Sequence, residues 1–267
     1  MTENALRDAV IGAGLLAGSA NVIMQLARAP VGHGVLESRV DSGNLFRHPV
    51  KRTRTTLTYL AVATMGTDAE RAAYRKGVNR AHAQVHSTAA SPVAYDAFDT
   101  GLQLWVAACL YKGFEDVYLA FTGGEPERFY AEAAALGTTL QVRPEMWPAD
   151  RAAFAAYWAD GLAEVRIDDD VRRYLTRIVD LEFLPPVLAL PGRRFHRFVT
   201  TGFLPQRFRD EMRLPWTAAD QRRFDVLLAA LGTVVRVLPG PVRRFPFNLC
   251  LQDLRWRLRT GRPLVGS

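Results

Sequence analysis

Hydrophobic positions recur at helical spacing along almost the whole chain, and two-residue alternation is rarely sustained. This period predicts an all-α fold, because an amphipathic helix places apolar residues at every third or fourth position, whereas a half-buried strand alternates. No internal repeat, low-complexity tract or long linker divides the 267 residues. We therefore expect residues 1–267 to form a single domain, a helical bundle around one hydrophobic core.

Local start and stop signals predict where individual helices lie. Thr67 and Glu70 form a Thr-x-x-Glu capping box, which opens a helix expected to run to about Ser87. Asp99 is the expected N-cap of a broadly apolar helix over residues 101–121, ended by Gly123-Gly124. Further helices are expected over residues 127–136, 149–165, 168–183, 217–231 and 249–259. The pairs Pro185-Pro186 and Pro191-Gly192 predict a non-helical connection over residues 185–192.

The longest apolar stretch runs from Ala9 to Ala29. It is long enough to span a bilayer, but its many small residues and two amides lower its tendency to insert. Glu3 and Asp8 argue against a signal peptide, so we expect a close-packed interior helix. The spacing Gly12-Ala-Gly14-Leu-Leu-Ala-Gly18 is found in some dinucleotide-binding turns, but the apolar run before it is too short for the strand such turns require.

The net positive charge lies at the carboxyl end. Residues 193–267 contain fifteen arginines, no lysine and five acidic residues, whereas the rest of the chain carries a net charge of −3. Such asymmetry occurs in proteins that bind nucleic acid or anionic lipid. Because no nucleic-acid-binding motif accompanies it, we expect a solvated face and no nucleic-acid partner, and we leave a peripheral membrane contact open. Two cysteines, Cys109 and Cys250, are too few for a disulfide scaffold or a Cys-based zinc site.

The expected helix over residues 67–87 carries His82 and His86 one turn apart, so both should project from the same side. The first imidazole can reach into the interior, and the second stays near the polar rim. Two histidines at this spacing can chelate zinc, but position 83 is alanine, where zinc proteases need a glutamate as proton acceptor, so that chemistry is excluded. The remaining interpretations are an ordinary hydrogen-bonded histidine and a neutral imidazole that ligates haem iron.

A second cluster of polar residues precedes this helix. If the chain enters a helix near Arg52, then Arg52 and Thr56 share a face, and both side chains could point into a pocket. The alternative is a basic surface turn in which Thr56 has no special role. Glu37, on an earlier turn, would ordinarily be solvated.

The order of these motifs resembles the family of the rubber oxygenase catalytic domain and the fungal mycophenolic-acid pathway oxygenase. The resemblance covers roughly residues 5–262, including the helices around Glu132 and Pro148 and the basic carboxyl end. Its motifs are Val22-Ile-Met-Gln25-Leu-Ala-Arg-Ala-Pro30-Val-Gly-His-Gly34-Val, Arg52-x-x-x-Thr56, Val78-Asn-Arg80-Ala-His82-Ala-Gln-Val85 and Asp99-Thr-Gly-Leu-Gln-Leu-Trp105-Val-Ala-Ala.

The resemblance implies a helical bundle that encloses a haem b pocket, with His82 as the proximal iron ligand and dioxygen as co-substrate. Arg52 and Thr56 would lie on the distal side, Arg52 also facing a haem propionate, and Glu37 would serve as an acid or base. Where rubber oxygenases have a lysine able to cap the iron, this chain has Thr55. Characterised relatives cleave carbon–carbon double bonds in isoprenoid chains, so the expected substrate is an unsaturated hydrophobic small molecule, terpenoid or polyketide-like.

Several alternatives stay open at this level. A haem peroxidase or peroxygenase would use peroxide in place of dioxygen, and a non-catalytic haem- or lipid-binding helical protein would share the fold without turnover. His86 remains an alternative iron ligand to His82. The protein is expected in the cytoplasm, with membrane association left open, and the sequence does not indicate an electron donor.

Overall fold

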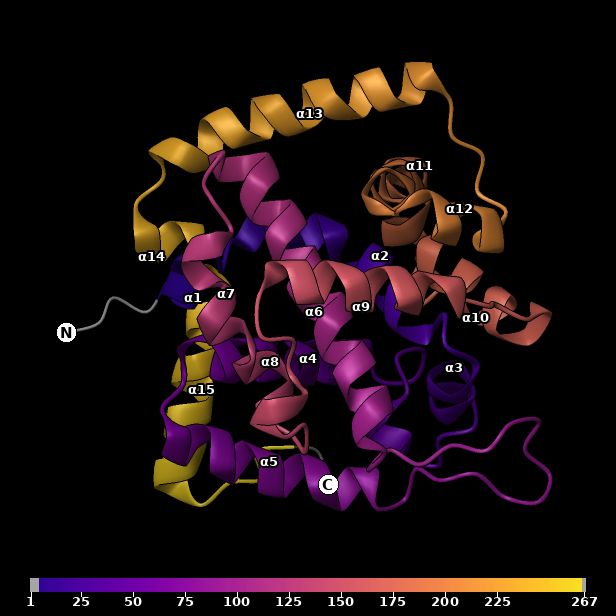
Figure 1. The fold of residues 1–267 in the computed structure, drawn as a ribbon, viewed down its shortest axis with the longest axis vertical. Coiled ribbons are helices and arrows are strands. Elements are labelled where there is room, and N and C mark those ends of the chain that lie inside the picture. The colour runs from indigo at the N-terminus through magenta and orange to yellow at the C-terminus, as the bar shows by residue number, and fades with distance from the viewer. Residues whose placement is uncertain (1–4, 266–267) are drawn as a thin grey trace.

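The computed structural model describes residues 5–265, and helices account for most of them (Figure 1). Within this range, the β-type pairing is confined to an isolated bridge between His86 and Asp96. The prediction of an all-α fold is therefore confirmed. The helices, in chain order, are α1 (Ala5–Asp8), η1 (Gly12–Ala17), α2 (Gly18–Leu26), α3 (Ala29–Leu36), η2 (Asp41–Gly43), α4 (Pro49–Met65), α5 (Asp68–His82), α6 (Thr100–Thr122), α7 (Glu127–Ala133), α8 (Ala135–Thr138), η3 (Pro144–Met146), α9 (Arg151–Ala163), α10 (Asp169–Val179), α11 (Pro186–Phe203), α12 (Gln206–Met212), α13 (Ala218–Val237), α14 (Gly240–Arg243) and α15 (Phe247–Thr260).

Helix α6 forms the centre of the bundle, with α2, α8 and α13 packed against it (Figure 1). Its boundaries follow the sequence signals, because the Asp99 carboxylate accepts hydrogen bonds from two backbone N–H groups of the first turn and Gly123 ends the helix at φ 66°. Trp105 and Tyr111 are buried in the core, and Cys109 lies beside them as a free thiol. Burial of each aromatic ring stabilises the fold by about 2 kcal/mol.

The sequence predicted one interior helix over the apolar stretch from Ala9 to Ala29, but this prediction is wrong. The stretch forms the 3₁₀ helix η1 and then α2, because its glycines allow close contacts that a side chain would block. A Cβ atom on Gly12 would lie 1.8 Å from the carbonyl oxygen of Phe245, and one on Gly14 would lie 2.9 Å from Val117. Gly12 and Gly14 therefore serve close packing, whereas a Cβ atom on Gly18 would meet nothing within 4 Å. Among residues 5–265, no helix combines the length and the apolarity needed to cross a bilayer.

The expected helix over residues 67–87 ends five residues early. Its capping box is present, since Glu70 N–H donates to Thr67 Oγ1 and Thr67 N–H to Glu70 Oε2, but α5 stops at His82. The chain leaves the helix at this point because the following segment turns back and pairs with itself. In this pairing, Ala97 N–H donates to the Val85 carbonyl. The prediction that His82 and His86 project from one helix face is therefore wrong.

The prediction of a non-helical connection over residues 185–192 is also wrong. Helix α11 begins at Pro186, where proline is tolerated, and continues through Pro191. A proline this far into a helix costs about 3 kcal/mol. Burial of Val199 and Phe203 in the later turns of the same helix offsets that cost.

Most of the other predicted helices are found with shifted ends. Helix α9 begins after its N-cap Asp150, α10 begins after Asp168 and ends at Val179, and α13 runs to Val237, beyond the expected end at residue 231. The segment expected as one helix over residues 127–136 is divided into α7 and α8.

Candidate functional site

Arg52 lies in the first turn of α4, which Pro49 starts in a position that suits its fixed φ. The guanidinium group is half-buried, and no hydrogen-bond or ion-pair partner for it is found within residues 5–265. Its electrostatic neighbours are the phenols of Tyr74 and Tyr174, and burial lowers the pKa of Arg52. Because arginine stays cationic in proteins, the structure contains a positive charge here without a counter-anion, an arrangement that normally costs stability.

Thr56 lies one turn further along α4, as expected, but its hydroxyl is used locally. Thr56 Oγ1 donates to the Arg52 carbonyl at 3.2 Å, and the residue is exposed. Thr55, which the resemblance predicts in place of an iron-capping lysine, makes the same kind of bond to the carbonyl of Lys51. The distal role assigned to Thr56 stays a prediction.

His82 is the last residue of α5, which packs against α4. The buried Tyr74 ties the two helices together, since its hydroxyl donates to the Thr55 carbonyl at 2.7 Å. The imidazole lies edge-on to Phe98, with ring centroids 6.2 Å apart. Burial, and then the charge of Arg52, lower the pKa of His82, so its ring is neutral at pH 7.

Hydrogen bonding singles out His82 among the five histidines. His33 contacts Asp168, and His48 contacts Asp41. His196 contacts Ser19 and a backbone carbonyl, and His86 is exposed near the carbonyl of Ser87. His82 Nδ1 is buried and has no partner in the described part of the chain. Buried polar groups are almost always paired, so this uncommitted imidazole indicates a site for a ligand.

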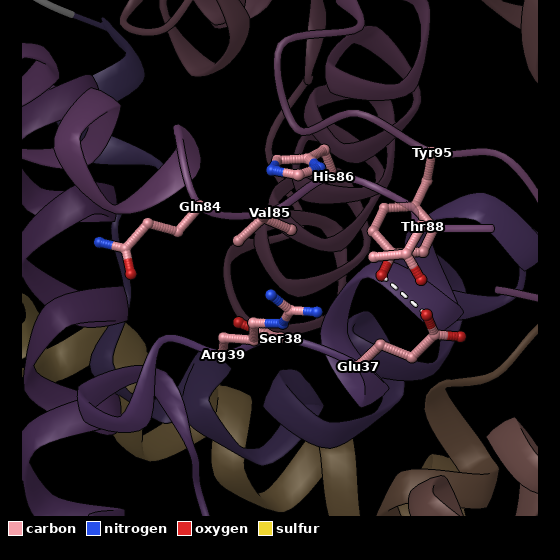
Figure 2. Close-up of a pocket in the computed structure, with 8 residues that line it drawn as sticks. All are labelled: Glu37, Ser38, Arg39, Gln84, Val85, His86, Thr88 and Tyr95. Carbon is pink, nitrogen blue, oxygen red and sulfur yellow. Dashed lines mark hydrogen bonds between the residues drawn. The ribbon is translucent and has the colours of Figure 1, made fainter. Parts of the chain in front are cut away.

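Glu37 follows α3 and belongs to a hydrogen-bonded group at the surface. Its Oε2 accepts hydrogen bonds from Ser91 Oγ at 2.5 Å and from Tyr95 Oη at 2.9 Å, and Figure 2 shows Tyr95 pointing at the carboxylate. The hydrogen bond from Ser91 makes the largest contribution to lowering the pKa of Glu37. The carboxylate is therefore ionised at neutral pH, which suits a proton acceptor better than a proton donor.

A cavity of about 90 Å³, large enough for a few water molecules, lies beside Glu37. His86 borders it, whereas His82 does not, so the two histidines face different surroundings. The cavity is lined by Glu37, Ser38, Arg39, Gln84, Val85, His86, Thr88 and Tyr95 (Figure 2).

His33 was not among the residues singled out from the sequence, yet it connects Glu37 to α10. Its imidazole is 6% exposed, with Nε2 at 2.8 Å from Asp168 Oδ2 and Nδ1 at 3.4 Å from Glu37 Oε1. Asp168 also caps α10 through its other oxygen. The signal in the sequence was the spacing of His33 and Glu37, four residues apart, which places them on one face of a helix.

The structure thus divides the predicted site residues into two groups. Arg52 and His82, both half-buried, lie near each other, and the charge of Arg52 acts on the pKa of His82. Glu37 belongs to the separate polar network of His33, Tyr95 and Ser91. Within residues 5–265, no hydrogen bond or ion pair joins Glu37 to Arg52 or His82.

Comparison with known proteins places these residues in a family. Residues 9–236 match the family described as ER-bound oxygenase mpaB/B'/Rubber oxygenase, catalytic domain. The uncharacterized proteins Mb2261 of Mycobacterium bovis and Rv2237 of Mycobacterium tuberculosis are each 51% identical to this chain over 256 residues, covering 94% of it and 100% of the relative. No solved structure matches. All four predicted site residues lie within the matched range, and the chain belongs to the family of MpaB-type and rubber oxygenase catalytic domains.

Proposed function

We propose that this protein is a haem b-dependent oxygenase that uses dioxygen to oxidise an unsaturated hydrophobic small molecule, by cleavage of a carbon–carbon double bond. The observation that carries the proposal is the neutral imidazole of His82, half-buried, with a buried Nδ1 atom that has no hydrogen-bond partner among the described residues, in a chain of an oxygenase family. A neutral imidazole with no hydrogen-bond partner is free to donate a lone pair to iron.

The surrounding residues fit a haem group. His82 would hold the iron, and the unpaired cation of Arg52 complements the anionic propionates. When bound, the haem would supply an iron that binds and activates dioxygen, which the side chains of this protein cannot do alone.

The protein's own residues then have separate tasks. Arg52 donates hydrogen bonds, either to a propionate or to oxygen that gains negative charge. Tyr74, fully buried, keeps α4 and α5 in register, so that Arg52 and His82 stay together. The apolar side chains of the bundle would exclude water from a bound hydrophobic substrate. Glu37, held by Tyr95 and Ser91, accepts a proton at Oε2 on the polar side.

The first test is whether the protein binds haem. The purified protein, as isolated or after addition of hemin, should show a Soret band and the pyridine haemochrome spectrum of haem b. A protein that stays colourless after addition of hemin would contradict the proposal.

The second test uses squalene and geranylgeraniol as unsaturated isoprenoid probes under ¹⁸O-labelled dioxygen. We expect label in a carbonyl product. Turnover that requires peroxide would identify a peroxygenase instead, and a haem-loaded protein without turnover of either probe would favour a binding protein.

A further inference from the structure

The first turns of α11 expose large apolar side chains. Val187 is 77% exposed, Leu188 59%, Leu190 68% and Phe195 50%. We name residues 186–195 the α11 tip. Monomeric proteins rarely leave apolar side chains clustered in solvent, and such clusters commonly mark an interaction surface.

Six of the exposed residues of the α11 tip form one continuous face. Relative to Val187, they lie at positions i, i+1, i+3, i+4, i+7 and i+8, which fall on one side of an α-helix. On the opposite side, Ala189 is buried, and Gly192 packs near Leu181. The tip therefore rests on the bundle along one side and presents the other to solvent. The outward face consists of Val187, Leu188, Leu190, Pro191, Arg194 and Phe195.

The charge around the tip favours an anionic partner. Residues 183–209 contain five arginines and no acidic residue. Arg193 and Arg197 are held by Asp180, whereas Arg194 is exposed within the apolar face itself. Apolar side chains interleaved with arginine match the interface of an anionic bilayer, where the chains enter the acyl boundary and the guanidinium contacts lipid phosphate.

The geometry of the tip fits a shallow contact. Because its apolar face runs along the side of the helix, the tip would lie in the plane of the interface, where such a face enters about 5–10 Å into the boundary between headgroups and acyl chains. Figure 1 views α11 nearly along its axis, beneath α13 and beside α12. We propose that the α11 tip inserts into the interface of an anionic membrane and anchors the protein there. This inference does not depend on haem or on turnover.

The experiment is co-sedimentation of the full chain with vesicles of phosphatidylcholine, with and without about 30% phosphatidylglycerol. The test variant is Leu188→Asp with Leu190→Asp. The matched control is Val226→Asp with Val234→Asp on α13, where the replaced side chains are 70% and 55% exposed and the added charge is the same. We expect the wild type and the control to bind anionic vesicles alike, and the test variant to bind about tenfold less.

Two further variants test the charge and the depth. Arg194→Glu should weaken binding to the anionic vesicles and leave the weak binding to neutral vesicles unchanged. In the variant Leu188→Trp, brominated acyl chains should quench the fluorescence of the new tryptophan, because its side chain enters the bilayer. The fluorescence of the new tryptophan in Val226→Trp should not be quenched. Circular dichroism and thermal midpoints establish that each variant is folded.

Three results would overturn the proposal. They are absence of wild-type binding to anionic vesicles, equal loss of binding in the test and control pairs, and failure of brominated lipid to quench the tryptophan at position 188. If sedimentation velocity instead shows a dimer that dissociates in the test variant, without vesicle binding, the α11 tip contacts a second copy of this chain.

Discussion

His33 Nε2 lies 2.8 Å from Asp168 Oδ2, so one buried imidazole ties α3 to the first turn of α10. Asp168 is at the same time the N-cap of α10. This contact therefore joins the start of α10 to His33, whose other ring nitrogen contacts Glu37 at the edge of the polar cavity.

Replacing His33 by alanine should destabilise the fold by about 2–3 kcal/mol, because a buried group that bridges two carboxylates is lost. Urea unfolding measures the change. The control is His48→Ala, whose partner Asp41 is solvent-exposed, and which should cost less than about 1 kcal/mol. Equal costs for the two variants would show that the contact between His33 and Asp168 adds nothing to stability.

His82→Ala should lose most of the bound haem, whereas His86→Ala should keep it, because His86 is exposed and borders the separate polar cavity. The ratio of Soret absorbance to protein absorbance measures retention after gel filtration. Loss confined to His86→Ala would identify His86 as the ligand and remove His82 from the proposal.

Arg52→Ala should retain haem but turn over at least about tenfold more slowly, because the hydrogen bonds that stabilise developing charge are removed. Oxygen consumption with the isoprenoid probe measures the rate. Arg54→Ala on the same helix is the matched control and should stay close to wild type. A fully active Arg52→Ala variant would exclude Arg52 from the reaction.

The contacts of Asp180 with two arginines predict how the free energy of unfolding depends on pH. Burial would raise the pKa of its carboxyl, but the hydrogen bonds and charges of Arg193 and Arg197 outweigh burial and lower it. A lowered pKa in the folded state contributes stability that is present above the unfolded value of about 3.9 and is lost as pH falls through the folded value.

Asp180→Asn should therefore lower the free energy of unfolding at pH 7 by about 2 kcal/mol and flatten its decline between about pH 5 and pH 2. Urea unfolding across this range measures both effects. An unchanged slope would show that other carboxylates produce the acid dependence.

Residues close in sequence made part of the fold predictable. The N-cap Asp99 and the terminating Gly123 act on the helix they border, so α6 was found within one residue at each end. The capping box of Thr67 and Glu70 and the helical period of the apolar positions are equally local. The family motif likewise predicted Arg52 and His82 as site residues without any knowledge of contacts, and that assignment stays a prediction.

The tertiary structure decided what depends on residues far apart in the chain. Burial of later turns carries α11 through Pro191, and pairing of residues 85 and 97 ends α5 before His86. The contact between His33 and Asp168 joins positions 135 residues apart. A local pattern reports the preference of one segment, whereas burial, and the presence or absence of a hydrogen-bond partner for His82, depend on segments brought together only when the chain folds.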